Sequence, residues 1–355
     1  MLSVIIPVYN SVQYLEECVL SVMKQSYSDI EMVIIDDAST DGSFELCDVL
    51  AKKDSRIKVF HFSENKGVSA ARNKGIEIAK GDYVTFLDSD DCLKTEYAEE
   101  LINAIKKENA DIVCCGIAEY RNGRLEKVQR SFKKSFKKDK LGFDCIYDAI
   151  ISCRGLDDSA ALNLTGAVCK VYRAEVIKKI RYNEKLHIGE DAIFFVDALK
   201  QADSFLFVNK ILYKRRIHVA SASYNKANEF YRESLKYLYG LCKEFLQTDK
   251  ERNKYTKYVV CAEQQFFLWG IKRGLGVFSF RRIKPLKREL RAYKNRMPVQ
   301  LTWNRSYEKK IVVFFIQTKC YYCYKLYACF ETVIRRIVLW LKMVLHYDFG
   351  AEYWW

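Results

Sequence analysis

Three carboxylates follow an apolar run near the end of the first hundred residues. The stretch GDYVTFLDSDDC, residues 81–92, passes from apolar side chains directly to Asp88, Asp90 and Asp91. An Asp-x-Asp at the end of a strand supplies hard oxygen ligands for Mg²⁺ or Mn²⁺, and such a cation can stabilise a nucleotide diphosphate as a leaving group. The same residues also suit an acidic turn or a helix cap, which is the role we expect of Asp91.

The surrounding pattern predicts strands that alternate with helices. Over residues 1–115 we expect strands at 3–8, 32–35, 57–62, 83–87 and 111–115, with helices at 12–23, 43–53, 68–80 and 95–109. Short connections between such elements favour parallel pairing, with crossover helices that cover both faces of the sheet. The predicted fold class is therefore α/β, with a Rossmann-like and mostly parallel central sheet.

The carboxyl ends of these strands carry the candidate ligands, because ligands bind beyond these ends in an open parallel sheet. The residues found there are Tyr9 and Asn10, Asp36 and Asp37, residues 65–67, and residues 88–91. A carboxylate at 36–37 could accept hydrogen bonds from a base or a ribose, or it could simply begin a turn. No glycine-rich phosphate loop occurs in the sequence, so a cation is the expected partner of bound phosphates.

Charge divides the chain into two parts with different expected partners. Residues 1–115 hold 12 basic and 21 acidic residues, whereas the remaining 240 hold 47 basic and 24 acidic ones. An acidic first part suits a metal-bridged site, and a basic, aromatic second part suits an anionic surface such as nucleic acid or phospholipid headgroups. The 13 cysteines, with no secretory signal before them, indicate thiols in a reducing compartment.

The domain organisation is predicted from the same composition. We expect a catalytic domain over residues 1–224, a helical basic extension over 225–300 and an amphipathic tail over 301–355. The tail separates basic from aromatic side chains on a helical wheel, as in a helix that lies in a membrane interface. A helix packed on the protein or across a dimer is the alternative. The basic stretch FKKSFKKDK, residues 132–140, is expected to be a solvated loop or helix face.

Five motifs together resemble the family 2 glycosyltransferases with the GT-A fold. They are PVYN at 7–10, DDASTDGS at 36–43, NKGVSAARNKG at 65–75, GDYVTFLDSDD at 81–91 and GEDAIFF at 189–195, in the family's order and approximate spacing. The resemblance covers residues 1 to about 220. It implies an inverting enzyme that transfers a sugar from a nucleotide diphosphate donor, usually a uridine diphosphate.

The resemblance also implies roles for individual residues. The implied nucleotide-sugar-binding residues are Pro7, Tyr9, Asn10, Asp36, Asp37, Arg72, Asp88, Ser89 and Arg216. Within this set, Tyr9 would stack on the base, Asp37 would read the edge of the base, and Arg72 would counter the charge of the nucleotide. The implied ligands of a Mn²⁺ or Mg²⁺ ion are Asp90 and Asp88, together with His218. Arg216 and His218 lie in YKRRIHVASAS at 213–223, which is similar to a further family motif, and His218 could instead be a plain surface histidine.

The implied catalytic base is Asp191, with Glu190 beside it near the acceptor. Direct displacement at an anomeric carbon needs one carboxylate to take the acceptor's proton and a separate cation to stabilise the diphosphate. GEDAIFF alone would be an ordinary helix start. The sequence departs from the family at GAVCKVYRAEV, residues 166–176, where relatives commonly have Trp-Asn-Lys-Leu-Tyr, so the identity of the acceptor stays open.

The predicted function is the transfer of a sugar to a glycan acceptor, expected to be lipid-linked, in surface polysaccharide or exopolysaccharide synthesis. We expect a cytoplasmic enzyme, peripheral on an anionic membrane surface, with no nucleic-acid partner. One alternative is a sugar nucleotidyltransferase, although PVYNSVQYL at 7–15 lacks the glycine-rich loop of that class. Others are a nucleic-acid-binding protein, suggested by the basic second part, and a relative that binds a nucleotide sugar without turnover.

Overall fold

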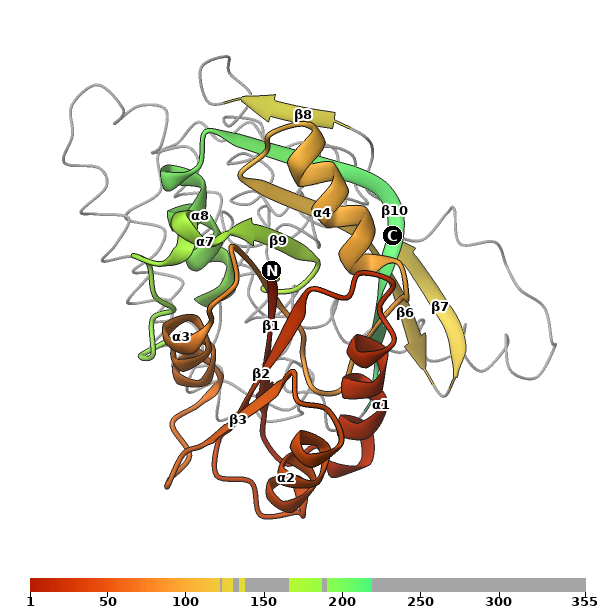
Figure 1. Ribbon diagram of the computed structural model, residues 1–355, viewed down its shortest axis with the longest axis vertical. Helices are drawn as coiled ribbons and strands as arrows, with labels where there is room; N and C mark the ends of the chain where they lie inside the picture. The colour runs from red at the N-terminus through yellow and green to blue at the C-terminus, as the bar shows by residue number, and fades with distance from the viewer. Residues whose placement is uncertain (122, 130–133, 138–165, 187–189, 219–355) are drawn as a thin grey trace, which may run out of the picture. The chain divides into compact units, whose positions relative to one another are not determined.

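The computed structural model describes residues 1–121, 123–129, 134–137, 166–186 and 190–218 (Figure 1). The first elements are β1 (Leu2–Val8), α1 (Val12–Met23), β2 (Ile30–Asp36), α2 (Ser43–Lys53), β3 (Ile57–His61), α3 (Val68–Ile78), β4 (Tyr83–Phe86), β5 (Cys92–Leu93) and α4 (Tyr97–Lys107). The later elements are β6 (Ile112–Arg121), β7 (Arg124–Gln129), β8 (Lys134–Lys137), β9 (Lys170–Arg173), α7 (Ala174–Ile177), α8 (Glu190–Gln201) and β10 (Ser204–Arg216). The predicted alternation over residues 1–115 is confirmed.

One mixed sheet organises these elements. Its strands follow the order β3-β2-β1-β4-β9-β6-β10-β5, with β7 paired to β6 and β8 to β10. The first four strands are parallel, but β9 is antiparallel to both β4 and β6. The expected α/β class is confirmed, although the sheet is less parallel than expected because β9 separates β4 from β6.

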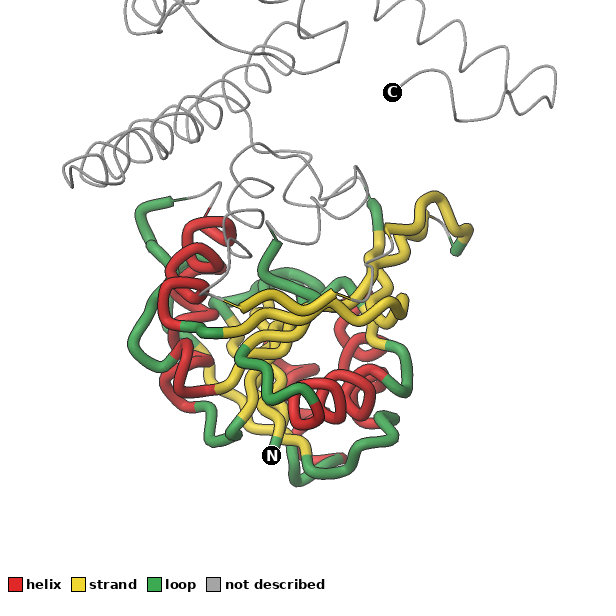
Figure 2. The backbone as a smooth tube through the Cα atoms, turned by 90° about the horizontal axis from the view of Figure 1, so that it is seen from above, coloured by secondary structure: helices red, strands yellow, loops and turns green. Residues whose placement is uncertain are grey.

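The core lies where helices cover the sheet on both sides (Figure 2). Every residue of β1 and β2 is buried, as expected of parallel strands that are covered on both faces. In Figure 1, α1, α2 and α4 lie on one side of β1, and α3, α7 and α8 lie on the other. Close packing extends to Gly75 of α3, where a Cβ atom would come within 2.3 Å of Ile5.

The end of β1 separates from β4 just before the candidate site. The ladder between these strands ends at Ile5 and Phe86, and the Ile5 carbonyl still accepts the N–H of Leu87. Backbone groups two residues apart on a parallel strand face the same neighbour, so Pro7 faces the side from which β4 has diverged. Proline has no N–H to leave unpaired there.

Two sequence expectations need a further comment. Residues 134–137 form β8, which pairs antiparallel with β10, so the expectation of a loop or helix face at 132–140 is wrong for these residues. The lysine-rich sequence forms a strand here because its backbone pairs with the long strand β10. The predicted basic extension and tail lie outside the described residues. Among the helices that the structure does describe, none has the length and apolar character to cross a membrane.

Candidate active site

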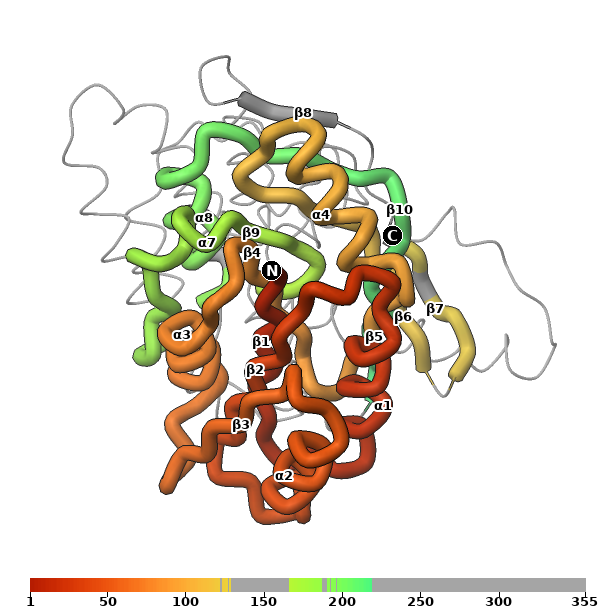
Figure 3. The backbone as a smooth tube through the Cα atoms, viewed as in Figure 1, coloured from red at the N-terminus to blue at the C-terminus, as the bar shows by residue number. Residues whose placement is uncertain are grey.

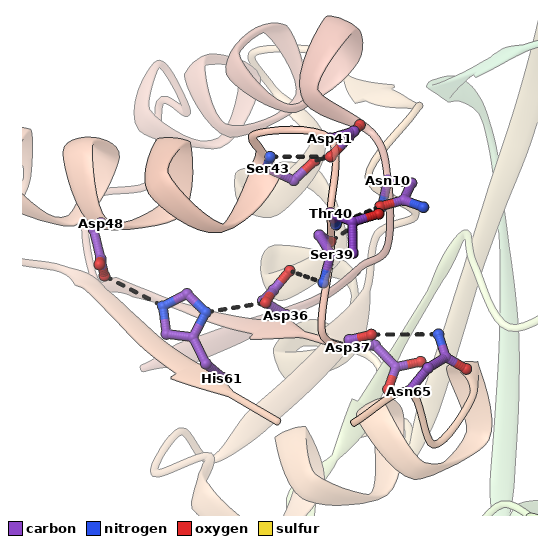
Figure 4. A network of polar contacts seen from close by, with 10 residues as sticks. All are labelled: Asn10, Asp36, Asp37, Ser39, Thr40, Asp41, Ser43, Asp48, His61 and Asn65. Carbon is purple, nitrogen blue, oxygen red and sulfur yellow. Dashed lines mark hydrogen bonds and ion pairs between the residues drawn. The ribbon is translucent and has the colours of Figure 1, made fainter. Parts of the chain in front are cut away.

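The end of β1 carries an exposed aromatic ring. Tyr9 follows the last residue of β1 and is 52% exposed. Asn10 has φ 49°, a left-handed conformation that asparagine tolerates better than most residues. Its Oδ1 accepts the N–H of Thr40 at 2.8 Å, and its own N–H donates to Ser39 Oγ at 3.0 Å (Figure 4). The turn after β1 is therefore tied to the turn after β2, while the Tyr9 ring stays accessible to a flat ligand.

Asp37, the residue that follows β2, is held by backbone groups at the start of α3. Its carboxylate oxygens accept the N–H groups of Lys66 at 2.7 Å and Gly67 at 2.8 Å. Gly67 has φ 88°, which glycine adopts without strain. Burial raises the pKa of Asp37 above its ordinary value, although the two N–H groups oppose this shift. Asp37 is thus a fixed acceptor at the carboxyl edge of the sheet.

Asp36 faces a different environment from its neighbour. Its side chain is fully buried, and its oxygens contact His61 Nδ1 at 3.1 Å and the N–H of Ser39 at 3.3 Å (Figure 4). Pro7 is also buried, so within PVYN the exposed residues are Tyr9 and Asn10. In this structure, Asp36 and Pro7 support the turns that present the exposed residues.

Arg72 of α3 binds the carboxylates of both Asp191, the predicted base, and Asp88, a predicted metal ligand. Its Nη1 donates to Asp191 Oδ1 at 2.7 Å, and its Nη2 donates to Asp88 Oδ1 at 3.0 Å. Glu190 lies 3.9 Å away, and the Arg72 side chain is only 5% exposed. Burial lowers the pKa of the guanidinium, but Asp191 and Asp88 outweigh this effect and hold the pKa above its ordinary value. Arg72 is therefore a buried cation that brings together residues far apart in the sequence.

Asp191 lies in the first turn of α8, next to Glu190. Burial raises the pKa of Asp191, and the Asp88 carboxylate acts in the same direction, while Arg72, Lys170 and a hydrogen bond from the backbone of Ala167 oppose the shift. A carboxylate with a raised pKa is a better proton acceptor than an ordinary one. Its side chain remains 24% exposed, so the group is restrained but accessible.

The predicted metal ligands Asp90 and His218 contact each other. The distance from Asp90 Oδ2 to His218 Nε2 is 2.8 Å. Burial raises the pKa of Asp90, the Asp88 carboxylate adds to the shift, and His218 opposes it. Arg216 donates from Nε to the Asp90 carbonyl at 3.0 Å and from Nη2 to Glu17 at 2.6 Å. The end of β10 is thus bound to the Asp-x-Asp turn and to α1.

Asp91 has a larger role than the predicted turn or cap. Its backbone N–H does close a turn with the Asp88 carbonyl. However, its buried carboxylate accepts the hydroxyl of Tyr213 and the N–H of Arg216, each at 2.7 Å. Burial raises the pKa of Asp91 well above its ordinary value. The neighbouring Ser89 Oγ lies 2.8 Å from the Oγ of Ser11.

Comparisons with known proteins agree with this arrangement. The family model described as "Glycosyl transferase family 2" matches residues 3–164. An uncharacterized glycosyltransferase of Haemophilus influenzae is 35% identical over 227 residues, which are 64% of this chain and 83% of the relative. The chain belongs to glycosyltransferase family 2.

Other relatives match over a smaller share of their own length. The putative teichuronic acid biosynthesis glycosyltransferase TuaG of Bacillus subtilis is 47% identical over 100 residues, 28% of this glycosyltransferase and 40% of TuaG. The matched regions span 38% and 31% of the lengths of two Streptococcus pneumoniae glycosyltransferases. Family membership favours glycosyl transfer over the nucleotidyltransferase and nucleic-acid-binding alternatives.

A solved structure shares the fold of this glycosyltransferase. The structure of S. aureus TarS in complex with UDP-GlcNAc superposes with a TM-score of 0.65 and 22% identity, and it covers 84% of this chain and 81% of that one. The predicted GT-A fold is therefore confirmed for the described part of the chain.

The candidate metal ligands of this glycosyltransferase can be compared with the ligands that divalent cations prefer. Among the residues that the structure describes, no three His, Cys, Asp or Glu side chains are grouped closely enough to hold a metal ion alone. Asp88, Asp90 and His218 still offer carboxylate oxygens and an imidazole, which suit Mn²⁺ or Mg²⁺. The raised pKa of Asp90, to which Asp88 contributes, is the electrostatic situation that a cation relieves. The oxygen and nitrogen atoms of these three side chains therefore suit a divalent cation in their chemistry.

Several contacts of the site have no signal in the sequence. Glu17 and Tyr14 of α1 bind Arg216, through an ion pair of 2.6 Å and a ring contact of 4.8 Å. Lys170 is fully buried and donates to the carbonyls of Gly166 and Val168. Lys170 and Tyr172 match the Lys and Tyr of the family's Trp-Asn-Lys-Leu-Tyr in the altered segment 166–176, and this match is the sign that could have drawn attention to Lys170.

Proposed function

We propose that this glycosyltransferase is an inverting, metal-dependent enzyme that uses a UDP-sugar donor and extends a glycan acceptor. The observation that carries the proposal is the position of Arg72, which binds both Asp191 and Asp88. One guanidinium thereby holds Asp191, the candidate base, close to Asp88, a candidate ligand of the cation that would stabilise the leaving group. An enzyme that displaces a diphosphate with an acceptor hydroxyl needs these two functions in this proximity.

The nucleotide is proposed to bind at the carboxyl ends of β1 and β2. The exposed ring of Tyr9 suits stacking on a base, and the fixed carboxylate of Asp37 can accept a hydrogen bond from the base edge. The complex of TarS with UDP-GlcNAc supports a uridine nucleotide, because TarS shares the fold. Asn10 and Asp36 would act by holding the turns that present these groups.

In the proposed reaction, Asp191 accepts the proton of an acceptor hydroxyl while the oxygen attacks the anomeric carbon. The bond from that carbon to the donor's phosphate oxygen breaks on the opposite face, so the configuration inverts. Arg72 keeps Asp191 in place, and Glu190 would orient the acceptor. A divalent cation held by Asp90, Asp88 and His218 would stabilise the departing diphosphate, with Arg216 as a further phosphate contact and Asp88 also near the ribose.

The acceptor is proposed to be a surface glycan, built on a lipid carrier at the cytoplasmic face of the membrane. The relative TuaG, named for teichuronic acid biosynthesis, supports a polysaccharide product. The excess of basic over acidic residues after position 115, 47 against 24, supports an anionic surface as the place of work. These two observations are independent of the catalytic assignment.

A UDP-release assay over a panel of UDP-sugars, with Mn²⁺ or Mg²⁺, tests the proposal on the full chain. The wild type should release UDP from one or a few donors. Asp191→Asn should lower the rate by about 10² to 10⁴, the usual contribution of a general base. UDP binding, measured by calorimetry, should survive in this variant.

Asp197→Asn is the matched control for this experiment. Asp197 lies on the same helix as Asp191 and binds Lys200 at 2.6 Å, outside the proposed site, so its variant should keep wild-type turnover. The proposal is wrong if no nucleotide sugar is bound or hydrolysed. It is equally wrong if Asp191→Asn retains full transfer to a competent acceptor.

A further inference from the structure

His61, the last residue of β3, lies between two carboxylates that belong to different elements. Its Nδ1 is 3.1 Å from Asp36 at the end of β2, and its Nε2 is 3.3 Å from Asp48 of α2 (Figure 4). The ring of Phe44 packs over the imidazole at a centroid distance of 3.8 Å. The orientation of the imidazole is therefore fixed on both edges and on one face.

The two carboxylates differ in burial, and this difference ranks the two contacts. The Asp36 side chain is 0% exposed, whereas that of Asp48 is 51% exposed. An ionised carboxylate only accepts hydrogen bonds, so the contact with Asp36 needs a proton on Nδ1 of the imidazole. Loss of a hydrogen-bond partner costs far more free energy when the carboxylate left behind is buried than when it is exposed. His61 is thus mainly the partner of Asp36.

Asp36 in turn controls the turn that follows β2. The oxygen that does not contact His61 accepts the N–H of Ser39, and Ala38 between them has φ 56°. A left-handed alanine is unfavourable by itself, so the surrounding contacts must hold the turn in this shape. The shape of the turn therefore depends on Asp36 having its partners in place.

The turn after β2 is also hydrogen-bonded to the residue that follows Tyr9 at the end of β1. Ser39 Oγ accepts the N–H of Asn10, and Asn10 Oδ1 accepts the N–H of Thr40. Asn10 is the residue that follows Tyr9. A continuous series of contacts thus runs from His61 through Asp36 and Ser39 to Asn10, the residue after Tyr9 (Figure 4).

We propose that His61 is a positioning residue for the nucleobase site, which it controls through Asp36 and the turn at 38–41. The inference rests on the proposed function, in which the base binds at Tyr9 and Asp37. His61 itself touches no part of the proposed ligand. Its removal should therefore weaken the binding of the nucleotide while leaving the chemical step unchanged.

The test is calorimetry of UDP with Mn²⁺ on the full chain, together with donor kinetics. His61→Leu should raise the dissociation constant of UDP and the donor KM by about tenfold, because a buried charged hydrogen bond is lost. The kcat at saturating donor should stay within about twofold of the wild type. His61→Gln, whose amide can still donate to Asp36, should recover most of the affinity, and Asp48→Ala should change it by only about twofold.

Lys58→Met is the matched control, because Lys58 lies on the same strand as His61 and is also the partner of a buried carboxylate. Lys58 binds the buried carboxylate of Glu31, whose other partners are Ser3 and the N–H groups of Lys80 and Gly81, away from the turn at 38–41. This variant should melt at a lower temperature and bind UDP as the wild type does. If Lys58→Met weakens UDP binding as much as His61→Leu, the effect is general instability and the positioning role is wrong.

The remaining outcomes separate the two proposals. UDP binding that is unchanged in both His61→Leu and Asp48→Ala overturns the positioning role alone. A loss of kcat without a change in donor KM also overturns it. A wild-type chain that binds no nucleotide overturns the proposed function and the positioning role together. A wild type that binds a different nucleotide corrects the proposed donor, and the same variants then judge His61 with that nucleotide.

Discussion

The two halves of the sheet hold their functional carboxylates in different ways. On the side of β1 to β4, Asp37 is bound by backbone N–H groups of residues 66 and 67. On the side of β9, β6 and β10, Asp191 is bound by a buried side chain, that of Arg72, which comes from α3 and also binds Asp88 after β4. Figure 3 shows β1 to β4 in red and orange, β6 in orange to yellow, and β9 in green.

This difference predicts where the molecule is sensitive to substitution. A backbone N–H remains when a side chain is replaced, so the contacts of Asp37 tolerate most changes at residues 66 and 67. The ion pairs of Asp191 and Asp88 with Arg72 disappear with one substitution at residue 72, and the two carboxylates then lose the cation that they share. Charge-removing variants should therefore be severe on the second side and mild on the first.

The largest effect is expected for Arg72→Met. Two carboxylates lose their common cation, and breaking a buried ion pair in this way costs about 3–5 kcal/mol. Transfer should fall by about 10³ or more, since both the base and the Asp-x-Asp turn are displaced. Urea denaturation and UDP release measure the two effects. Arg56→Met is the control from the first side, because Arg56 pairs with the nearby Asp54 in a partly buried ion pair outside the proposed site; equal losses in both variants would contradict the comparison.

Removal of the divalent cation should have the next largest effect. EDTA should lower the transfer rate by about 10² or more, and Mn²⁺ should restore it, because the proposed cation would stabilise the leaving diphosphate. Asp90→Asn should have a comparable defect that excess Mn²⁺ relieves only in part. The exposed Asp82, which pairs with the chain's amino group at 3.0 Å, provides the control Asp82→Asn. Full activity in EDTA would show that the enzyme needs no cation.

The first side of the sheet was largely predictable from the sequence. Apolar runs fix where β1, β2 and β4 end, and parallel strands bring their carboxyl ends to one edge. For this reason Tyr9, Asp37 and Asp88 could be identified as a group before the structure was considered. The distinct environments of Asp36 and Asp37 were not predictable, because they depend on His61 of the next strand.

The second side could not be derived from periodicity. The contact between Arg72 and Asp191 joins positions 119 apart, and that between Asp90 and His218 joins positions 128 apart. Only the resemblance to a family pointed to Asp191, and nothing pointed to the antiparallel insertion of β9. Four residues of strand carry too little pattern to reveal their direction or their neighbours.

Lys170→Met should have a moderate effect that is confined to the second side. Lys170 binds the carbonyls of Gly166 and Val168, and Ala167 between them donates to Asp191. Loss of the ammonium should loosen this turn and lower transfer by about tenfold, with no change in UDP affinity. Turnover and calorimetry test this directly, with Lys200→Met on the surface of α8 as the control. A weaker affinity for UDP would mean that the two sides are not independent.

The smallest expected effect is a displacement of the pH profile. Asp191 must be ionised to accept a proton, and burial raises its pKa above the ordinary value of 3.8. The kcat should therefore fall as the pH is lowered through this raised pKa, at a higher pH than an ordinary aspartate would give. Arg72 opposes the rise, so Arg72→Lys, with its less complementary contacts, should move the acidic limb to still higher pH. The profile is measured at saturating donor and Mn²⁺, with a melting curve at each pH to show that the chain stays folded. A kcat that stays flat down to pH values near 4, or a limb that Arg72→Lys does not move, would mean that the proton goes to a group other than Asp191.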